Sequence, residues 1–521
     1  MSAFIHPRSE GILVLDYGSQ YTLLITRRLR ELGFYAEIID GSAKTEAPRD
    51  FKSFGIILSG GPDTVSEGGR QLPPWVLTSK VPVLGICYGM QLLVTEFSGK
   101  LRSGKSREFG KSLLQIAPPK SDIAKQVFKN IPSSCTVWMS HGDDMETLPS
   151  DFELVAKTDQ GVAAAIAHKH LPLIGLQYHP EVQHSEFGSE LLSNFATVAC
   201  KAPRNWQLHS MVEATIQAAQ QTVNKGKVLV ACSGGVDSSV TVALITKALG
   251  PDRVKGVFID TGLLRKNEVP WVSANLKAMG VDLEVIDAKD RFFQKLSGVS
   301  DPEAKRKIIG YAFIEEFEAY AKGKGYSHLG QGTLYPDVIE SAGHGSGAKV
   351  IKSHHNVGGL PEKLAMELVE PFRFLFKDEV RRIGKELGLP SDMIDRHPFP
   401  GPGLAVRIPG IVDREKALIC QEADDIFIKA LREHHLYDAV WQAFVVLLPV
   451  KSVGVMGDNR TYQYACSLRA VLASDGMTAG VAELPMSFLT MVADRIVRNV
   501  DGINRVLYDV TSKPPATIEW E

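Results

Sequence analysis

The sequence predicts an α/β protein with two doubly wound, mostly parallel-sheet domains and a smaller α+β C-terminal unit. Three observations predict this class. Short apolar segments alternate with helical patterns over the first two hundred residues and again from residue 227 onward, as in covered parallel sheets. The chain has 521 residues, too many for one ordinary core. A proline-rich stretch at 398–402 precedes a change of pattern. We therefore place domains at 10–202, 203–397 and 398–521.

The composition gives no strong overall charge. Hydrophobic residues make up 44%, charged residues 23%, and the formal net charge is −2, so no overall field favours nucleic acid or membranes as partners. Residues 1–10 lack the apolar core of a signal peptide, and no apolar run approaches the ~18 residues that span a bilayer. We expect a cytosolic protein without nucleic-acid or membrane partners. The six cysteines show no paired spacing, so neither disulfides nor zinc are predicted.

The first predicted sheet has strands at 11–15, 54–58, 81–86 and 173–178, and a helix at 21–32 that Gly33 closes. The third strand runs into GICYGMQ, which places Cys87 between two glycines at a strand-to-helix junction. This is the sulfur analogue of the nucleophile elbow, and a helix N-terminus there favours the thiolate. By itself, such a cysteine is more often an inert core thiol.

A nucleophilic cysteine needs a base, and the base needs an orienting group. The strand at 173–178 delivers His179 and Glu181 at its end. We expect Cys87 to attack an amide carbonyl, His179 to move the proton and Glu181 to fix the imidazole tautomer. A lone histidine here would be more often structural, but the three residues together favour the catalytic interpretation.

Three stretches, SGGP at 59–62, GICYGMQ at 85–91 and YHPE at 178–181, resemble the class I glutamine amidotransferase family over about residues 11–200. The resemblance implies a γ-glutamyl thioester on Cys87 and release of ammonia. It also implies an oxyanion hole formed by the N–H groups of Gly60 and Tyr88. Residues 140–143 alone are equally typical of a plain polar turn. The residues implied to contact glutamine are Gln91, Ser140, His141 and Asp143.

The second unit begins with a helix at 208–223 and a strand at 228–232, followed by SGGVDSS at 233–239 and a helical pattern from near residue 240. Its glycines let the backbone approach a ligand closely, its serines add donors, and the helix N-terminus favours an oxyanion such as phosphate. The Walker lysine is absent, and Asp237 lies inside the turn. An ordinary turn of small residues is the alternative interpretation.

SGGVDSS resembles the pyrophosphate loop of the N-type ATP pyrophosphatases. The resemblance implies that ATP is cleaved between its α and β phosphates and that AMP is transferred to a substrate oxygen. The residues implied to bind ATP are Ser233, Gly234, Gly235, Val236, Asp237, Ser238 and Ser239.

Further strands are predicted at 253–260, 281–287 and 327–331, with a helix at 305–320. Carboxylates just past the last strand could hold Mg²⁺ between ATP phosphates, and we assign Asp237, Asp337 and Glu340 to this ion. A basic, glycine-rich stretch follows, with the composition of a mobile lid. The lid residues are Lys352, His354 and His355. Paired histidines also suggest zinc, but no third ligand is apparent. The charged stretch at 376–381 needs no function beyond starting a helix.

Together with residues 396–407 and 513–521, these stretches resemble the glutamine-hydrolysing GMP synthetase family nearly end to end. The resemblance implies that ATP adenylates the C2 oxygen of xanthosine monophosphate (XMP) and that ammonia then displaces AMP. It implies an XMP site drawing on Arg306, Lys513 and Glu519. Cations there suit a phosphate, although Arg306 alone is more typical of a solvated helix end. Another glutamine-dependent adenylating synthetase, or a regulatory protein with an inactive amidotransferase fold, is the alternative.

The C-terminal unit shows helices at 411–434 and 487–500 and strands at 443–448, 452–456, 462–472 and 503–510. Its apolar surface exceeds what so small a unit can bury, which predicts a symmetric homodimer through this unit. The last residues, KPPATIEWE, combine prolines, an aromatic ring and carboxylates. We expect this tail to fold back into a site rather than to fray.

Overall fold

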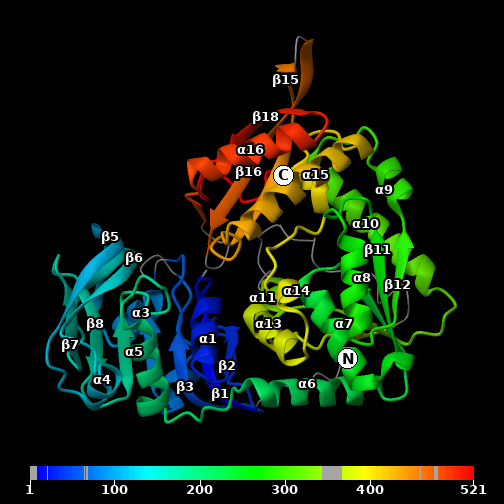
Figure 1. The fold of residues 1–521 in the computed structure, drawn as a ribbon. Helices are drawn as coiled ribbons and strands as arrows, with labels where there is room; N and C mark the ends of the chain where they lie inside the picture. The colour runs from blue at the N-terminus through cyan, green and yellow to red at the C-terminus, as the bar shows by residue number, and fades with distance from the viewer. Residues whose placement is uncertain are drawn as a thin grey trace. The chain divides into compact units, whose positions relative to one another are not determined.

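The computed structural model of the protein describes residues 9–521 except residues 20, 64, 66–68, 343–365, 457–458 and 474–478. The chain forms two compact units: Ile5–Met211 make up most of the first, and Val212–Val338 with Gly347–Glu521 make up most of the second. The predicted α/β class is confirmed in both (Figure 1). Within the described residues, no helix is long and apolar enough to cross a membrane.

The first unit is built on a nine-stranded sheet in the order β2-β1-β3-β4-β9-β8-β7-β5-β6. The half from β2 to β9 is parallel and contains the predicted strands. The half from β9 to β6 is antiparallel, and its strands β8, β7, β5 and β6 come from a region to which we assigned no strands. The strands are β1 (Glu10–Asp16), β2 (Ala36–Asp40), β3 (Lys52–Leu58), β4 (Val83–Ile86), β5 (Lys100–Ile116), β6 (Ser134–Thr147), β7 (Phe152–Thr158), β8 (Ala163–His168) and β9 (Leu173–Leu176).

Helices of this unit pack on the sheet through apolar faces. The core under α3 joins buried residues of the parallel strands, such as Ile56 and Val83, to Leu93 of the helix. Gly33 closes the first helix with φ +90°, as predicted. The helices are α1 (Thr22–Glu31), α2 (Trp75–Thr78), α3 (Tyr88–Glu96), α4 (Asp122–Val127), α5 (Gly188–Asn194) and the π-helical turn η2 (Phe195–Ala199).

The second unit contains a five-stranded, wholly parallel sheet in the order β12-β11-β10-β13-β14. The chain leaves β10 toward β11 on one side and returns to β13 on the other, so β10 lies at the point where the strand order reverses. Ligands of such sheets bind outside the carboxyl ends of the strands at this point. The strands are β10 (Val228–Cys232), β11 (Val254–Asp260), β12 (Leu283–Asp287), β13 (His328–Gly330) and β14 (Glu367–Val369).

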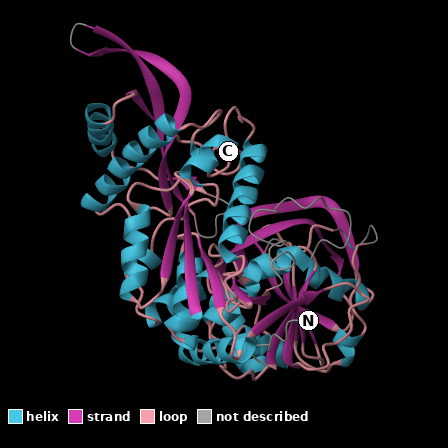
Figure 2. Cartoon of the chain, turned by 90° about the vertical axis from the view of Figure 1, so that its right-hand side faces the viewer, coloured by secondary structure: helices cyan, strands magenta, loops and turns pink. Residues whose placement is uncertain are grey.

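Helices surround this sheet in both views (Figures 1 and 2). The predicted helix at 208–223 is observed with the same bounds, and the helix predicted at 305–320 starts three residues earlier, at Pro302. The helical segments are α6 (Leu208–Val223), α7 (Val236–Leu249), η3 (Pro251–Arg253), α8 (Glu268–Ala278), α9 (Lys289–Lys295), α10 (Pro302–Ala321), α11 (Tyr335–Ala342), α13 (Lys377–Glu386), α14 (Ser391–Ile394) and η4 (Gly403–Arg407).

The C-terminal part of this unit is a mixed sheet covered by two helices. The strands predicted at 443–448 and 452–456 are one strand, because β15 continues past a register shift between Leu447 and Lys451. Buried residues from Leu229 to Ile503 form one core, so the boundary predicted at 397/398 lies inside a compact unit and stays a prediction. The elements are α15 (Arg414–Glu433), β15 (Gln442–Met456), β16 (Asn459–Leu472), β17 (Gly480–Val481), α16 (Met486–Asn499) and β18 (Ile503–Tyr508).

Candidate active sites

The first candidate site is a sharp turn between β4 and α3. Cys87 occupies it with φ +52° and ψ −105°, a conformation that residues with a side chain rarely adopt. The flanking glycines are required by close approach: a Cβ on Gly85 would lie 2.5 Å from the Gly89 carbonyl, and one on Gly89 would lie 2.4 Å from the Leu58 oxygen. The turn therefore has the strand–elbow–helix geometry predicted for a nucleophile.

The other two members of the predicted triad follow the neighbouring strand, β9. His179 Nδ1 lies 2.7 Å from Glu181 Oε1, and both side chains are buried. Burial alone would lower the pKa of His179, but the Glu181 carboxylate and the nearby Cys87 side chain outweigh it and hold that pKa well above its ordinary value. The pair can thus accept and keep a proton from the thiol.

The remaining predicted glutaminase residues surround this triad. A Cβ on Gly60 would lie 3.2 Å from His179 Cε1, so the Gly60 backbone borders the imidazole. Tyr88 is the first residue of α3, where N–H groups have no intrahelical acceptor. Gln91 Nε2 donates to the Asp143 carbonyl at 3.2 Å. The sequence thus identified groups that the fold gathers around Cys87.

The polar turn predicted for residues 140–143 is wrong. Ser140, His141 and Asp143 lie inside strand β6, because its residues alternate between buried and exposed positions and pair with β5. The stretch nevertheless reaches the site: Cys87 Sγ donates to the Ser140 carbonyl at 3.6 Å, and His141 Nδ1 lies 2.9 Å from the Asp143 carbonyl. The site is therefore bordered by a strand.

The second candidate site is the turn after β10, at the carboxyl edge of the five-stranded sheet. Helix α7 begins at Val236, not near residue 240 as predicted, so the turn itself is only Ser233–Gly235. Gly234 has φ +76°, and a Cβ there would lie 3.0 Å from the Phe258 ring. The Ser233 hydroxyl accepts the Gly235 N–H at 3.3 Å and lies 3.1 Å from the Ser238 hydroxyl. Val236, Asp237, Ser238 and Ser239 form the first turn of α7.

Asp237 is the charged member of this turn. Its Oδ2 lies 3.7 Å from Lys377 Nζ, whereas its buried Oδ1 has no hydrogen-bond partner among the described residues. Burial raises the pKa of Asp237, the cations Lys377 and Arg381 act against this rise, and the carboxylate of Asp337 adds to it. A buried carboxylate oxygen without a hydrogen-bond partner, under the electrostatic influence of a second carboxylate, is the kind of group whose charge a divalent cation would neutralise.

The other predicted magnesium ligands are only partly described. Asp337 Oδ2 accepts the Leu334 N–H at 2.9 Å. The side chain of Glu340 is outside the described residues. No cluster of three or more acidic, histidine or cysteine side chains with metal-binding geometry occurs among the residues described. Two carboxylates therefore fit Mg²⁺, and the ion itself stays a prediction.

Cations near the turn were not recognised in the sequence. Lys377 and Arg381 lie on α13, a helix we read as an ordinary charged segment, and Arg396 donates to the Gly234 carbonyl at 2.9 Å. These residues follow the turn by more than a hundred positions, and only the packing of α13 on α7 brings the first two to it. In the sequence, Lys377 and Arg381 are two cations in a helix rich in both charges, which does not set them apart.

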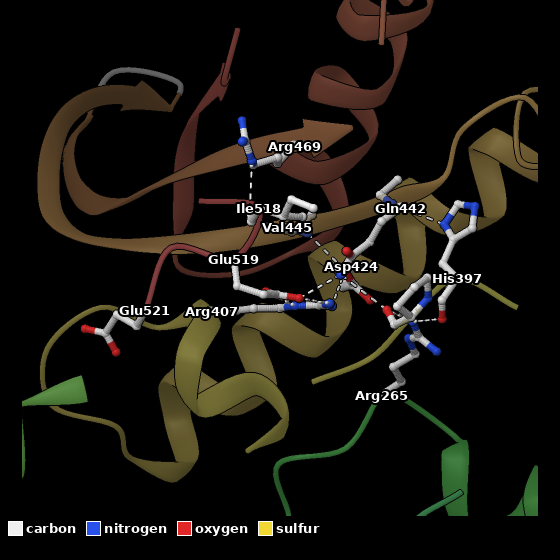
Figure 3. A network of polar contacts seen from close by, with 12 residues as sticks. Arg265, His397, Arg407, Asp424, Gln442, Val445, Arg469, Ile518, Glu519 and Glu521 are labelled. Carbon is white, nitrogen blue, oxygen red and sulfur yellow. Dashed lines mark hydrogen bonds and ion pairs between the residues drawn. The ribbon is translucent and has the colours of Figure 1, made fainter. Parts of the chain in front are cut away.

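The C-terminal tail carries two of the three predicted XMP residues and folds back onto its own unit (Figure 3). The Glu519 carboxylate accepts two bonds from Arg407, at 3.1 and 3.0 Å, and one from Gln442 at 2.7 Å. Arg306 donates to the Glu521 main-chain oxygen. Lys513 pairs with Ala479 through its backbone.

The tail therefore lies against the polar residues that surround Arg407, as Figure 3 shows. Arg407 and Gln442 were not among the predicted site residues. Arg407 is wholly buried between Glu519 and Asp424, the latter at 3.8 Å. The predicted lid residues Lys352, His354 and His355 lie outside the described residues.

Comparison with known protein families assigns one family to the first compact unit and two families to the second. Residues 13–199 match the family described as glutamine amidotransferase class-I, residues 227–323 match the phosphoadenosine phosphosulfate reductase domain, and residues 429–520 match the GMP synthase C-terminal domain. The fold and the triad therefore define a glutamine amidotransferase joined to a nucleotide-binding sheet.

Full-length relatives identify the particular family. A glutamine-hydrolyzing GMP synthase of Thermosipho africanus (strain TCF52B) is 50% identical over 517 residues, which cover 98% of this chain and 99% of that relative. One of Aquifex aeolicus (strain VF5) is 51% identical over 512 residues, with 98% and 99% covered. The chain belongs to the glutamine-hydrolysing GMP synthase family.

Proposed function

We propose that this protein makes GMP from XMP, using ATP to activate XMP and glutamine as the nitrogen source. The observation that carries the proposal is the Cys87–His179–Glu181 arrangement in a chain that also places SGGVDSS at the carboxyl end of β10. The family assignment supports the choice of XMP as acceptor over other adenylated substrates. We also propose the cytosol as the place of this reaction.

In the first half-reaction, His179 takes the Cys87 proton and Sγ attacks the amide carbonyl of glutamine. The Gly60 and Tyr88 N–H groups would donate to the resulting oxyanion. His179 then gives the proton to the leaving nitrogen, which departs as ammonia and leaves a γ-glutamyl thioester. Water, deprotonated by His179, hydrolyses the thioester to glutamate. We assign glutamine binding to Gln91, Ser140, His141 and Asp143.

In the second half-reaction, the XMP C2 oxygen attacks the α-phosphorus of ATP and the turn at 233–239 holds the departing pyrophosphate. Main-chain N–H groups at the start of α7 and the serine hydroxyls supply donors, while Lys377 and Arg381 add positive charge. Asp237 and Asp337, with Glu340, would hold Mg²⁺, which when bound neutralises phosphate charge. Ammonia then displaces AMP from C2 and yields GMP.

The acceptor site and the lid belong to the same proposal. Arg306 and Lys513 would bind the XMP phosphate, and Glu519 would accept from the purine or ribose. The contacts of Glu519 with Arg407 and Gln442 support a preorganised tail, because they fix its carboxylate before XMP arrives. Lys352, His354 and His355 would close over the bound nucleotide.

The product set tests this function directly. Purified protein with XMP, ATP, glutamine and Mg²⁺ is expected to form GMP, AMP, pyrophosphate and glutamate in equal amounts. Chromatography measures the nucleotides and coupled enzyme assays measure the other products. IMP in place of XMP is the control, because it lacks the C2 oxygen that must be adenylated. Release of ADP and orthophosphate would reject α–β cleavage.

We further propose that the C-terminal unit pairs with a second copy of the chain. The β15–β16 hairpin extends beyond the helices of its unit in both views (Figures 1 and 2). Val453, Val455 and Tyr462 are 47%, 74% and 65% exposed. Val453 and Val455 lie two residues apart, and Tyr462 pairs with Val453, so all three share one face. An exposed apolar strip of this kind suits a symmetric dimer, in which the same strip of a second copy would cover it.

A charge on this strip is expected to separate the dimer. The double variant Val455→Asp and Tyr462→Asp should sediment as a monomer at micromolar concentration, whereas the unmodified protein should sediment as a dimer, because burying two carboxylates in an apolar interface is unfavourable. Leu171→Asp is the control, because it places the same charged side chain on an exposed apolar residue of the first unit. It should not change sedimentation. A dimeric double variant would place the interface elsewhere.

A further inference from the structure

Gln177 lies beside the nucleophile because of strand register. Ile86, the last residue of β4, pairs with Leu176, the last residue of β9, so the next residues along each strand, Cys87 and Gln177, are neighbours at the carboxyl edge of the sheet. The Cys87 N–H donates to the Leu176 carbonyl at 2.7 Å, and the Gln177 N–H donates to Ala164 of β8 at 2.9 Å. Both backbones are therefore fixed.

The side chain of Gln177 reaches the reacting sulfur. It is 1% exposed, and its Nε2 donates to Cys87 Sγ at 3.7 Å, within the range of hydrogen bonds to sulfur. Its Oε1 is buried and has no hydrogen-bond partner among the described residues. A buried amide with half of its capacity unused is a poor choice for packing alone, since an aliphatic side chain of similar shape would avoid that cost. Packing therefore does not explain why the Gln177 amide donates to the Cys87 sulfur.

We propose that Gln177 is a catalytic residue of the glutamine-hydrolysing site and that its side-chain N–H stabilises the Cys87 thiolate. The inference rests on the proposed glutaminase half-reaction and adds a residue to it. The proton leaves Sγ for His179, and the electron pair left on sulfur then accepts the Gln177 N–H. Hydrogen bonds to an ionised acceptor are about twice as strong as neutral ones, so the contact strengthens as the thiolate forms.

The other hydrogen bond of the Cys87 sulfur favours the protonated thiol over the thiolate. The thiol donates to the Ser140 carbonyl at 3.6 Å, a bond that exists only while the sulfur keeps its proton. Loss of that proton leaves a carbonyl dipole facing an anion. Gln177 supplies a donor that offsets this repulsion, and its rigid backbone aims it before substrate binds. His179 provides the base, and Gln177 provides the donor for the product of deprotonation.

Alkylation of Cys87 tests this role without any substrate. Iodoacetamide labelling of the whole protein, followed by mass spectrometry of the Cys87 peptide, is measured from pH 5 to 9. In Gln177→Leu the labelling profile is expected to move to higher pH and glutamine-dependent kcat/KM to fall about 10- to 100-fold, the size of a lost hydrogen bond to a charged group. Ammonium-dependent GMP synthesis should not change.

Two further variants and one control keep the test decisive. Gln177→Met retains the length of the side chain without its donor and is expected to show the same shifted profile and the same loss of glutamine-dependent activity. It serves as the test if ammonium-dependent synthesis shows that Gln177→Leu misfolds. Gln177→Glu brings a carboxylate to the sulfur and should shift the profile further. Gln220→Leu, which removes a side-chain amide bond to Ala248, is the control and should match the unmodified protein. An unchanged labelling profile in Leu and Met variants would overturn the role of Gln177, whatever the overall reaction proves to be.

Discussion

Replacing Cys87 with alanine is expected to abolish glutamine-supported GMP formation and to leave ammonium-supported formation intact. Without the sulfur no thioester can form, and loss of a nucleophile that acts as one unit with its base typically costs on the order of 10⁴-fold or more. The ATP turn lies in the other compact unit and needs only ammonia, so its chemistry does not depend on Cys87. Parallel assays with saturating glutamine and with ammonium chloride at alkaline pH measure both activities.

Cys135 provides the matched control in the same unit. It is also a buried free cysteine, but burial raises the pKa of its thiol to about 11, so it has almost no thiolate at neutral pH. Cys135→Ala should keep both activities. Loss of ammonium-supported synthesis in Cys87→Ala would mean that the two reactions cannot be separated. Retained glutamine use would mean that another group is the nucleophile.

Most strands of the parallel sheets were predicted correctly, as were the long strands of the C-terminal sheet. Strands such as Val83–Ile86 are buried along their whole length and give a continuous run without polar side chains. The antiparallel half of the first sheet was missed because strands such as β6 alternate buried and exposed residues and carry Ser, His and Asp, which also favour turns. Composition alone cannot separate the two, since pairing with β5 decides the outcome.

The sites show the same difference between local and distant information. Cys87 and its glycines, or Ser233 and the residues after it, occupy one turn each, and local backbone geometry fixes their relation. Gln177, Lys377 and Arg396 reach these turns through strand register or helix packing, with about 90 to 160 intervening residues. No single-sequence pattern encodes those contacts. The motif residues were therefore predictable, whereas the groups that surround and polarise them required the fold.

Replacing Asp237 with asparagine is expected to stop pyrophosphate release with either nitrogen source. Its unpartnered Oδ1 and the neighbouring Asp337 provide the negative charge that a Mg²⁺–ATP complex would neutralise, and an amide keeps the shape but not the charge. Lys377 also loses its anionic partner at 3.7 Å and is left free to pair with phosphate in an unproductive way. Radiolabelled ATP measures pyrophosphate and AMP directly, and rates should fall at least about 10³-fold, as for loss of a group that acts on the transition state.

Stability distinguishes loss of function from misfolding in the same variant. The pKa of Asp237 is raised in the folded protein, so the protonated side chain favours the folded state at low pH. This contribution to stability is lost as pH rises through the folded-state pKa. At neutral pH the ionised side chain therefore lowers the free energy of unfolding. Asp237→Asn removes this cost, and its thermal midpoint without ligands should rise. Asp282→Asn, an exposed partner of Lys255, is the control and should keep full activity. A variant that released pyrophosphate normally would show that Asp237 takes no part in ATP cleavage, whereas an inactive variant with a lowered midpoint would indicate a structural role.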